Sequence, residues 1–121
     1  MEVSRRLANF GVEVAGLDLT RSITRDDAAT LRRVLSTQSL ILLRGPMLSA
    51  AQQRRFANLF GITALPQGLP KCDSHGSVYV SNAAEGGVLG AAELALHADE
   101  FFLEEPCMYL VLHALEVPPR R

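Results

Sequence analysis

The sequence has few cysteines, no long apolar run and no apolar segment near its start, and each absence removes a class of protein. Cys72 and Cys107 are the only two cysteines and follow no framework spacing, so we expect free thiols rather than disulfides. No stretch approaches the ~20 apolar residues of a membrane span. Residues 1–11 carry charges but lack the apolar core of a secretory signal. The sequence therefore predicts a cytoplasmic protein without a membrane partner.

The chain also lacks an excess of either charge. Its 12 basic residues nearly balance its 13 acidic ones, and basic residues occur in pairs at most. A nucleic-acid-binding surface needs a basic stripe or patch, so we expect no nucleic-acid partner. A small-molecule ligand is the better expectation.

Length and patterning predict one small α/β (α+β) domain over residues 1–121, since 48% hydrophobic content suffices for a core. Two helices carry start signals. Thr24 with Asp27 precedes an amphipathic pattern over residues 25–37, whose apolar positions include Leu31 and Val34. Ser49 and Gln52 form a capping box before residues 50–60, and Gly61 stands where a left-handed cap is expected.

The predicted strands are residues 12–19 with a bend at Gly16, 39–44 buried on both faces, 78–81, 94–99 and 108–117. Two stretches rich in turn residues, 62–77 and 82–92, separate them. Long loops in compact domains are often functional, and the loop at residues 86–90 is a candidate lid.

His97 and Asp99 are the strongest candidate site residues. In a strand, residues two apart point to one face, so both side chains would hold adjacent positions around one divalent ion. A histidine and a carboxylate are two-thirds of the triad that binds non-haem Fe(II). The competing interpretation is an incidental polar pair on a half-exposed strand, because His-x-Asp alone is common.

Other motifs carry weaker signals. His113 is a candidate third ligand, although a surface or hydrogen-bonded histidine is the better explanation. Cys72 and His75 form one Cys-x-x-His pair, whereas structural zinc needs two such pairs. The glycines of residues 86–90 lack the dinucleotide-binding spacing, and no nucleophile elbow is present.

The order of several segments resembles the TauD/TfdA-like Fe(II)/2-oxoglutarate dioxygenases. Residues 11–19 (GVEVAGLDL) are similar to that family's opening strand, and 40–45 (LILLRG) to its VLVFRG strand. Residues 49–61 are similar to its T-x-E-Q-x-x-F-A-x-x-F-G helix, and 78–82 (VYVSN) to the strand that enters the active site. Residues 96–99 (LHAD) stand where the family has W-H-T-D.

This resemblance implies a fold, a reaction and site residues. The fold would be the N-terminal portion of a double-stranded β-helix (jelly-roll, clavaminate-synthase-like), with two helices packed on the sheet. The reaction would be C–H hydroxylation of a small organic substrate with Fe(II), 2-oxoglutarate and O2. His97 and Asp99 would hold the metal, and Phe102, Tyr79 and Asn82 would line the substrate pocket, with Asn82 also a candidate for the cofactor.

The resemblance also implies that the domain in residues 1–121 is incomplete. The family's Gly-Gly-Asp-Thr segment, distal His and 2-oxoglutarate-binding Arg follow the point where this sequence stops. The alternative function is therefore a catalytically inactive, truncated module that acts as a binding or oligomerising piece. An open sheet edge would favour a homo-oligomer.

Overall fold

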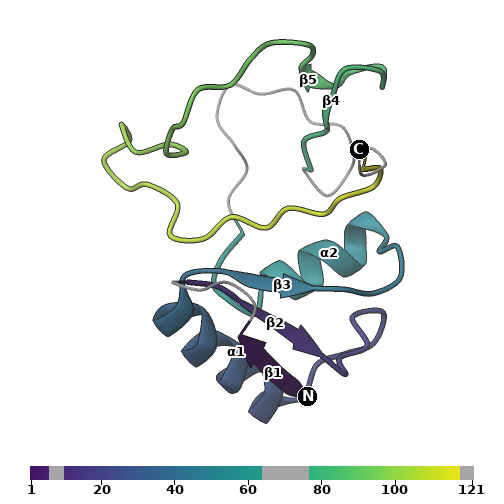
Figure 1. The fold of residues 1–121 in the computed structure, drawn as a ribbon, viewed down its shortest axis with the longest axis vertical. Helices are drawn as coiled ribbons and strands as arrows, with labels where there is room; N and C mark the ends of the chain where they lie inside the picture. Colours follow the sequence, from purple (N-terminus) through teal and green to yellow (C-terminus); the bar gives the residue numbers. More distant parts are fainter. Residues whose placement is uncertain (6–9, 64–76, 118–121) are drawn as a thin grey trace. The chain divides into compact units, whose positions relative to one another are not determined.

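The structure, a computed structural model, describes residues 1–5, 10–63 and 77–117. These residues form two helices and five short strands (Figure 1). The mixed α/β class with two helices is therefore confirmed. The chain divides into two compact units, one of Met1–Gly61 with His113–Arg121 and one of Ile62–Leu112.

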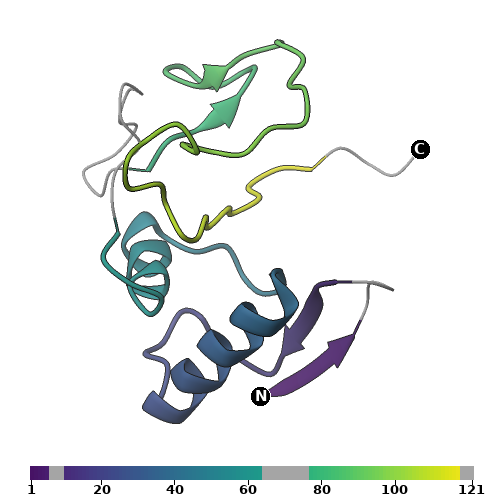
Figure 2. The same ribbon diagram turned by 90° about the vertical axis from the view of Figure 1, so that its left-hand side faces the viewer.

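The first unit is built on a three-stranded sheet in the order β1-β2-β3. Strand β1 (Glu2–Arg5) pairs antiparallel with β2 (Val12–Ala15), and β2 pairs parallel with β3 (Ile41–Leu43). Parallel neighbours need a crossover connection, and helix α1 (Arg25–Gln38) supplies it. Figures 1 and 2 show α1 running along one face of this sheet.

The core of the described chain lies wholly within the first unit. Leu31 of α1 and Val14 of β2 are its largest fully buried side chains. Alternation along β2 places Val12 and Val14 on one face and Glu13 on the other. Glu13 is 9% exposed, and Arg44 Nε lies 3.3 Å from its Oε2. The seven buried hydrophobic residues are Val12, Val14, Leu19, Ala28, Leu31, Val34 and Phe56.

Both predicted helix starts are confirmed. The side chain of Thr24 accepts a hydrogen bond from the Asp27 backbone N–H, so α1 begins at Arg25 as expected. Helix α2 (Ala50–Ala57) has the complete capping box, in which Ser49 Oγ accepts from Gln52 N–H and Gln52 Oε1 accepts from Ser49 N–H. Each cap satisfies backbone donors that the first helical turn leaves free.

The predicted end of the second helix is wrong. The helix stops at Ala57 rather than near Phe60, and its cap Asn58 is right-handed. The next residues continue as tight turns, with Leu59 N–H donating to Phe56 O and Phe60 N–H to Ala57 O. Gly61 has a φ of 155°, so it follows these turns instead of capping the helix.

Replacing Ser49 by Ala is expected to lower the free energy of unfolding by about 1 kcal/mol, because it removes one half of the capping box. Urea denaturation followed by circular dichroism measures this. Ser36→Ala is the matched control, since the Ser36 hydroxyl donates to the Arg33 carbonyl within α1 and caps no helix start. An equal loss in both variants would contradict the capping role of Ser49.

Strands are predicted less well than helices in the first unit. The opening strand is confirmed over Val12–Ala15, which form β2, and the chain bends at Gly16, whose φ is 76°. The strand does not continue over residues 17–19, so that part of the prediction is wrong. Burial of residues 39–44 on both faces is wrong, because β3 lies at the edge of the sheet as described and Leu42 is 41% exposed. Strand β1 was not predicted.

The second unit has little regular structure in its described part. Strand β4 (Val80–Ser81) pairs parallel with β5 (Val88–Leu89), so the expected loop at 82–92 contains a strand. A Cβ at Gly87 would lie 2.7 Å from the Ser81 carbonyl oxygen, which explains the glycine. The strand predicted at 108–117 is wrong, since those residues pair with no described neighbour. Most of the loop predicted at 62–77 lies outside the described residues.

Candidate functional site

His97 and Asp99 lie in irregular backbone, so the strand predicted at residues 94–99 is wrong. A strand needs a hydrogen-bonded neighbour, and in the described part of the second unit β4 and β5 pair only with each other. The argument that strand alternation puts both side chains on one face therefore does not apply. Another feature must bring them together.

The structure nevertheless places the two side chains side by side. His97 Nε2 lies 3.2 Å from Asp99 Oδ1, and the side chains are 50% and 43% exposed. On the other side of the ring, His97 Nδ1 lies 2.8 Å from the Ala95 carbonyl oxygen. A carbonyl oxygen only accepts, so Nδ1 carries a proton and donates it. In the neutral ring, Nε2 is then the unprotonated nitrogen that faces Asp99.

This arrangement favours positive charge between the ring and the carboxylate. The hydrogen bond to the Ala95 carbonyl is the largest effect and raises the pKa of His97 above its ordinary value. Desolvation, the second-largest effect, lowers the pKa, and the charge and hydrogen bond of Asp99 raise it by smaller amounts. An unprotonated Nε2 and a carboxylate oxygen are both acceptors. A proton or a metal cation between them removes their repulsion.

The donor set fits a divalent transition metal. Imidazole and carboxylate are ligands of Fe(II), and a ligating histidine usually donates its other ring N–H to a carbonyl or carboxylate. Ala95 provides that carbonyl. Two ligands about 2.1 Å from one ion and about 90° apart are about 3.0 Å from each other. The 3.2 Å separation of the two donor atoms is close to that value.

A third ligand does not accompany this pair in the part of the chain that the structure describes. No three His, Cys, Asp or Glu side chains gather there in a way that would hold a metal. His113 is half-buried and belongs to the first unit. The Cys72 and His75 pair lies outside the described residues. Cys107 is an exposed free thiol, as predicted.

The predicted substrate-pocket residues are exposed. Tyr79 is 36% and Phe102 77% exposed, and Asn82 is also exposed. Phe102 packs edge-to-face against Phe101, with ring centroids 5.9 Å apart and an interplanar angle of 81°. These contacts do not form an enclosed pocket, so the role of the three residues stays a prediction.

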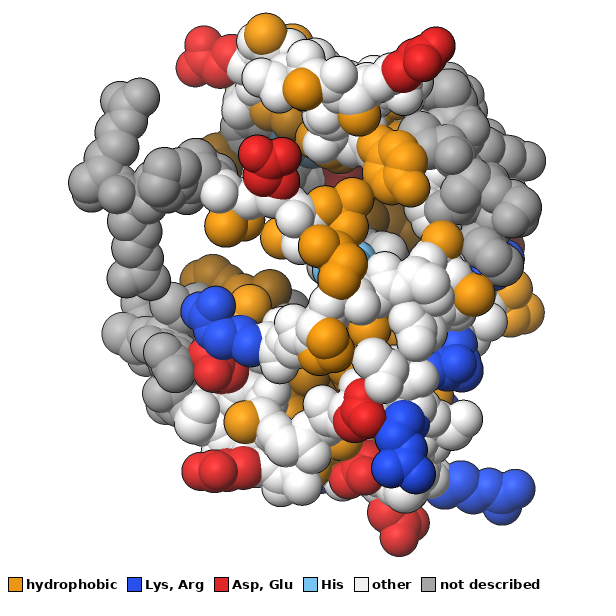
Figure 3. All heavy atoms as spheres, turned by 90° about the vertical axis from the view of Figure 1, so that its right-hand side faces the viewer, with side chains coloured by type: hydrophobic (Ala, Val, Ile, Leu, Met, Phe, Trp, Pro, Cys, Tyr) orange, Lys and Arg blue, Asp and Glu red, His pale blue; other side chains and the backbone are white. Residues whose placement is uncertain are grey.

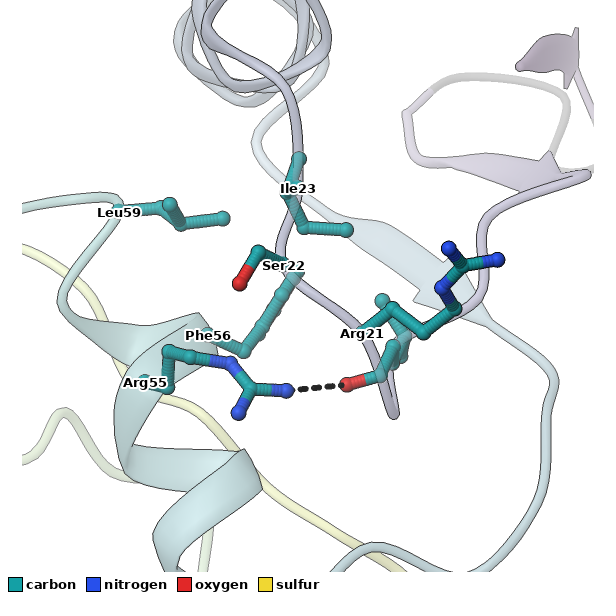
Figure 4. Close-up of a pocket in the computed structure, with 7 residues that line it drawn as sticks. Arg21, Ser22, Ile23, Arg55, Phe56 and Leu59 are labelled. Atoms are coloured by element: carbon teal, nitrogen blue, oxygen red, sulfur yellow. Dashed lines mark hydrogen bonds between the residues drawn. The ribbon is translucent and has the colours of Figure 1, made fainter.

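A hollow in the first unit was not predicted from the sequence. It lies between the segment after β2 and helix α2 (Figure 4). Arg55 Nη2 donates to the carbonyls of Thr20 at 2.9 Å and Leu19 at 3.4 Å. Gln52 Nε2 also donates to Thr20 O at 3.3 Å. These bonds hold the segment against the helix, so the hollow lies where the two pack together. Its lining is Leu19, Arg21, Ser22, Ile23, Arg55, Phe56 and Leu59.

Neither of the two described helices has the length and apolar character that crossing a bilayer requires. Comparison with curated proteins gave no match.

The solved structures that are similar to this chain include the following two. One is the protein AAD-2 in complex with Mn(II) and N-oxalylglycine, with 22% identity and a TM-score of 0.50 over 51% of this chain and 25% of that one. The other is a protein from Burkholderia xenovorans assigned to the alpha-ketoglutarate-dependent taurine dioxygenases, with 28% identity and a TM-score of 0.58 over 64% of this chain and 28% of that one. The chain thus spans about a quarter of each.

A family model gives the wider match. The model for the taurine catabolism dioxygenase TauD, TfdA family aligns with residues 3–120. That range includes His97 and Asp99 and nearly the whole sequence. The chain therefore belongs to the TauD/TfdA family of dioxygenases.

Proposed function

We propose that this protein is an Fe(II)- and 2-oxoglutarate-dependent dioxygenase that hydroxylates a C–H bond of a small organic substrate. The observation that carries the proposal is the 3.2 Å approach of His97 Nε2 to Asp99 Oδ1, with the ring tautomer set by Ala95. Membership of the TauD/TfdA family and similarity to the Burkholderia xenovorans protein support it. The jelly-roll fold and a single, incomplete domain over residues 1–121 belong to the same proposal.

Each candidate residue of this chain would have a separate role in the proposed reaction. His97 and Asp99 would hold the metal in two adjacent positions and leave the others open. When bound, Fe(II) and 2-oxoglutarate supply the oxidising power that inserts oxygen from O2 into the C–H bond. Tyr79, Asn82 and Phe102 would orient the substrate, with Asn82 also near the cofactor. The third metal ligand and the arginine for 2-oxoglutarate would come from outside the described residues.

Thermal unfolding of the chain with Fe(II) and 2-oxoglutarate, measured without oxygen, tests this function. A ligand that binds the folded state at 100 times its dissociation constant stabilises it by about 2.7 kcal/mol, so we expect a higher Tm with both ligands. Mn(II), titrated by electron paramagnetic resonance, gives an independent count of bound metal. His113→Ala is the control that keeps binding. An unchanged Tm together with no bound Mn(II) would contradict the proposal.

The alternative, a non-catalytic interaction module, also has a supporting observation. No residue among 77–117 is buried, and apolar side chains reach the surface there; Figure 3 shows exposed apolar side chains on one face of the molecule. Large exposed apolar patches mark interaction surfaces. Light scattering separates the two functions, because a stable oligomer that binds no Mn(II) favours the module. The most exposed large hydrophobic residues among 77–117 are Leu96, Phe101, Phe102, Met108 and Leu112.

A further inference from the structure

Charge is divided unequally between the two units of the chain. The first unit holds eleven of the twelve basic residues and six of the thirteen acidic ones, so its net charge is positive. The second unit holds the other seven acidic residues, and its only basic residue is Lys71. The near-neutral total is thus the sum of two units of opposite charge. Copies of such a chain attract each other wherever the first unit of one faces the second unit of another.

An exposed pair of aromatic rings lies in the second unit. Leu103 N–H donates to the Glu100 carbonyl oxygen at 3.0 Å and closes a turn, whose two central positions are Phe101 and Phe102. These two side chains are 71% and 77% exposed. We call residues 100–105 the aromatic turn. Its last two residues are exposed carboxylates, Glu104 and Glu105.

The aromatic turn has the chemistry of an interface residue pair. Aromatic side chains are enriched at the centres of protein–protein interfaces, because each buries a large apolar area. The ring of Phe102 packs edge-to-face against Phe101, with centroids 5.9 Å apart, and this contact limits the freedom that Phe101 loses on binding. The carboxylates beside the rings add a requirement for charge. A complementary surface therefore combines apolar walls with a cation.

The first unit contains a hollow with apolar walls between β1 and helix α1. Its volume is about 370 Å³, and it is open to solvent. Val12 and Val34, each 6% exposed, line it together with Val3, which is 43% exposed. Val3 lies opposite Val14 in the β1–β2 register, so it belongs to the sheet face that α1 covers. The helix leaves this part of the face open, and the hollow has room for an aromatic side chain.

Arg33 of α1 supplies the cation of this hollow. It is exposed, and its guanidinium has no hydrogen bond or ion pair with any residue that the structure describes. Other arginines of the first unit are already engaged, since Arg32 and Arg55 donate to backbone carbonyls and Arg44 pairs with Glu13. Arg33 is therefore free to pair with the carboxylates of another molecule.

We propose that the aromatic turn of one copy of this chain docks in the β1–α1 hollow of a second copy. Phe101 buries its ring against Val3 and Val34, and the carboxylates of the turn pair with Arg33. Charge complementarity between the two units selects a second copy as the occupant. Each copy has one turn and one hollow, so two copies can exchange both contacts, or each copy can bind two others. The contact does not involve the metal pair and does not rest on the function proposed above.

Sedimentation velocity of the full chain over a concentration series is the first measurement. We expect association that weakens several-fold between about 0.1 M and about 1 M salt, because the Debye length falls from about 10 Å to about 3 Å. Phe101→Ala and Arg33→Glu should each weaken association about tenfold or more.

Two matched controls make the same chemical changes outside the contact. Phe10→Ala removes another exposed ring, and Arg25→Glu reverses another exposed charge on α1. Neither residue is among those found to line the hollow. Both variants should stay within about twofold of the parent chain. Circular dichroism of every variant verifies that its helices are formed.

A mixture of two variants is the decisive measurement. The Arg33→Glu chain keeps its aromatic turn, and the Phe101→Ala chain keeps its hollow, so one intact contact forms between them. We expect a one-to-one pair in the mixture at concentrations where each variant alone is monomeric. Reversal of both sides, in the triple variant Arg33→Glu with Glu104→Arg and Glu105→Arg, should recover most of the association.

Three outcomes would overturn the proposal. The first is a parent chain that stays monomeric at every concentration. The second is a mixture in which the two variants remain monomeric, because the contact would then not join a turn to a hollow. The third is association that Arg33→Glu leaves unchanged, since another surface, such as the open sheet edge at β3, would then form the interface.

Discussion

Replacing Leu31 by Ala is expected to lower the free energy of unfolding by about 3 kcal/mol. Leu31 is 0% exposed and is one of only seven buried hydrophobic residues in the described chain. Truncation removes the transfer free energy of the lost methyl groups and leaves a cavity that the neighbours fill only in part. In a core of seven side chains, few neighbours can move into the cavity that Leu31→Ala leaves. We therefore expect the loss of unfolding free energy to lie near the middle of the usual range for such substitutions.

Urea denaturation followed by helical circular dichroism measures this loss, because α1 carries Leu31 and most of the helical residues. Leu42→Ala is the matched control: it removes the same atoms from β3, where Leu42 is 41% exposed, and we expect a loss under about 1 kcal/mol. Equal effects of the two substitutions would show that the first unit is not organised around α1.

The helices are predictable because their signals are local. Thr24 with Asp27, and Ser49 with Gln52, each satisfy backbone donors within three residues, so the sequence alone contains both partners. The end of α2 is harder to predict, since the turns after Ala57 continue the same apolar pattern through Phe60 without helical bonding. Asn58, and not the more obvious Gly61, is the cap.

A strand forms only beside another strand that accepts and donates its hydrogen bonds, and the local sequence does not show which segment that is. Residues 94–99 and 108–117 have the apolar character of strands, yet neither pairs with another described segment. Glu2–Arg5 has little apolar character, and it forms β1 because β2 provides hydrogen-bonding partners. Residue composition indicates which side chains favour a strand. The hydrogen-bonded ladder between two strands depends instead on the tertiary structure.

The sequence indicates candidate site residues but not the geometry in which they lie. Residue types and their order identify His97 and Asp99. In the structure the two side chains approach each other without the expected strand, and the Ala95 carbonyl sets the orientation of the His97 ring. A backbone acceptor such as the Ala95 carbonyl leaves no periodic pattern in a sequence.

Replacing Asp99 by Ala is expected to lower Mn(II) affinity roughly 100-fold or more, because even outer-shell partners of a metal contribute 10- to 100-fold. His97→Ala should have an effect of the same size. Each variant leaves one ligand of the pair in place, and a single exposed side chain binds a divalent ion weakly. Glu105→Ala is the control, as it removes an exposed carboxylate of the second unit without touching the pair.

The pH profile of the same titration identifies the ligand directly. Metal needs the neutral imidazole, so below the raised pKa of His97 the apparent affinity should fall about tenfold per pH unit. In the metal-free chain the sign is opposite. The protonated ring is favoured on folding, so any stability from its contact with Asp99 is present at low pH and is lost as the pH rises through the pKa of His97.

Asp99→Asn gives the decisive profile. The contribution of Asp99 to the raised pKa of His97 disappears, whereas the larger contribution of the Ala95 carbonyl remains. Affinity above the transition should therefore fall, because a carboxylate ligand is lost, and the transition itself should move to lower pH. A transition that stays at the pH of the parent chain would mean that His97 and Asp99 do not face each other in solution, and that metal bound by this chain uses other ligands.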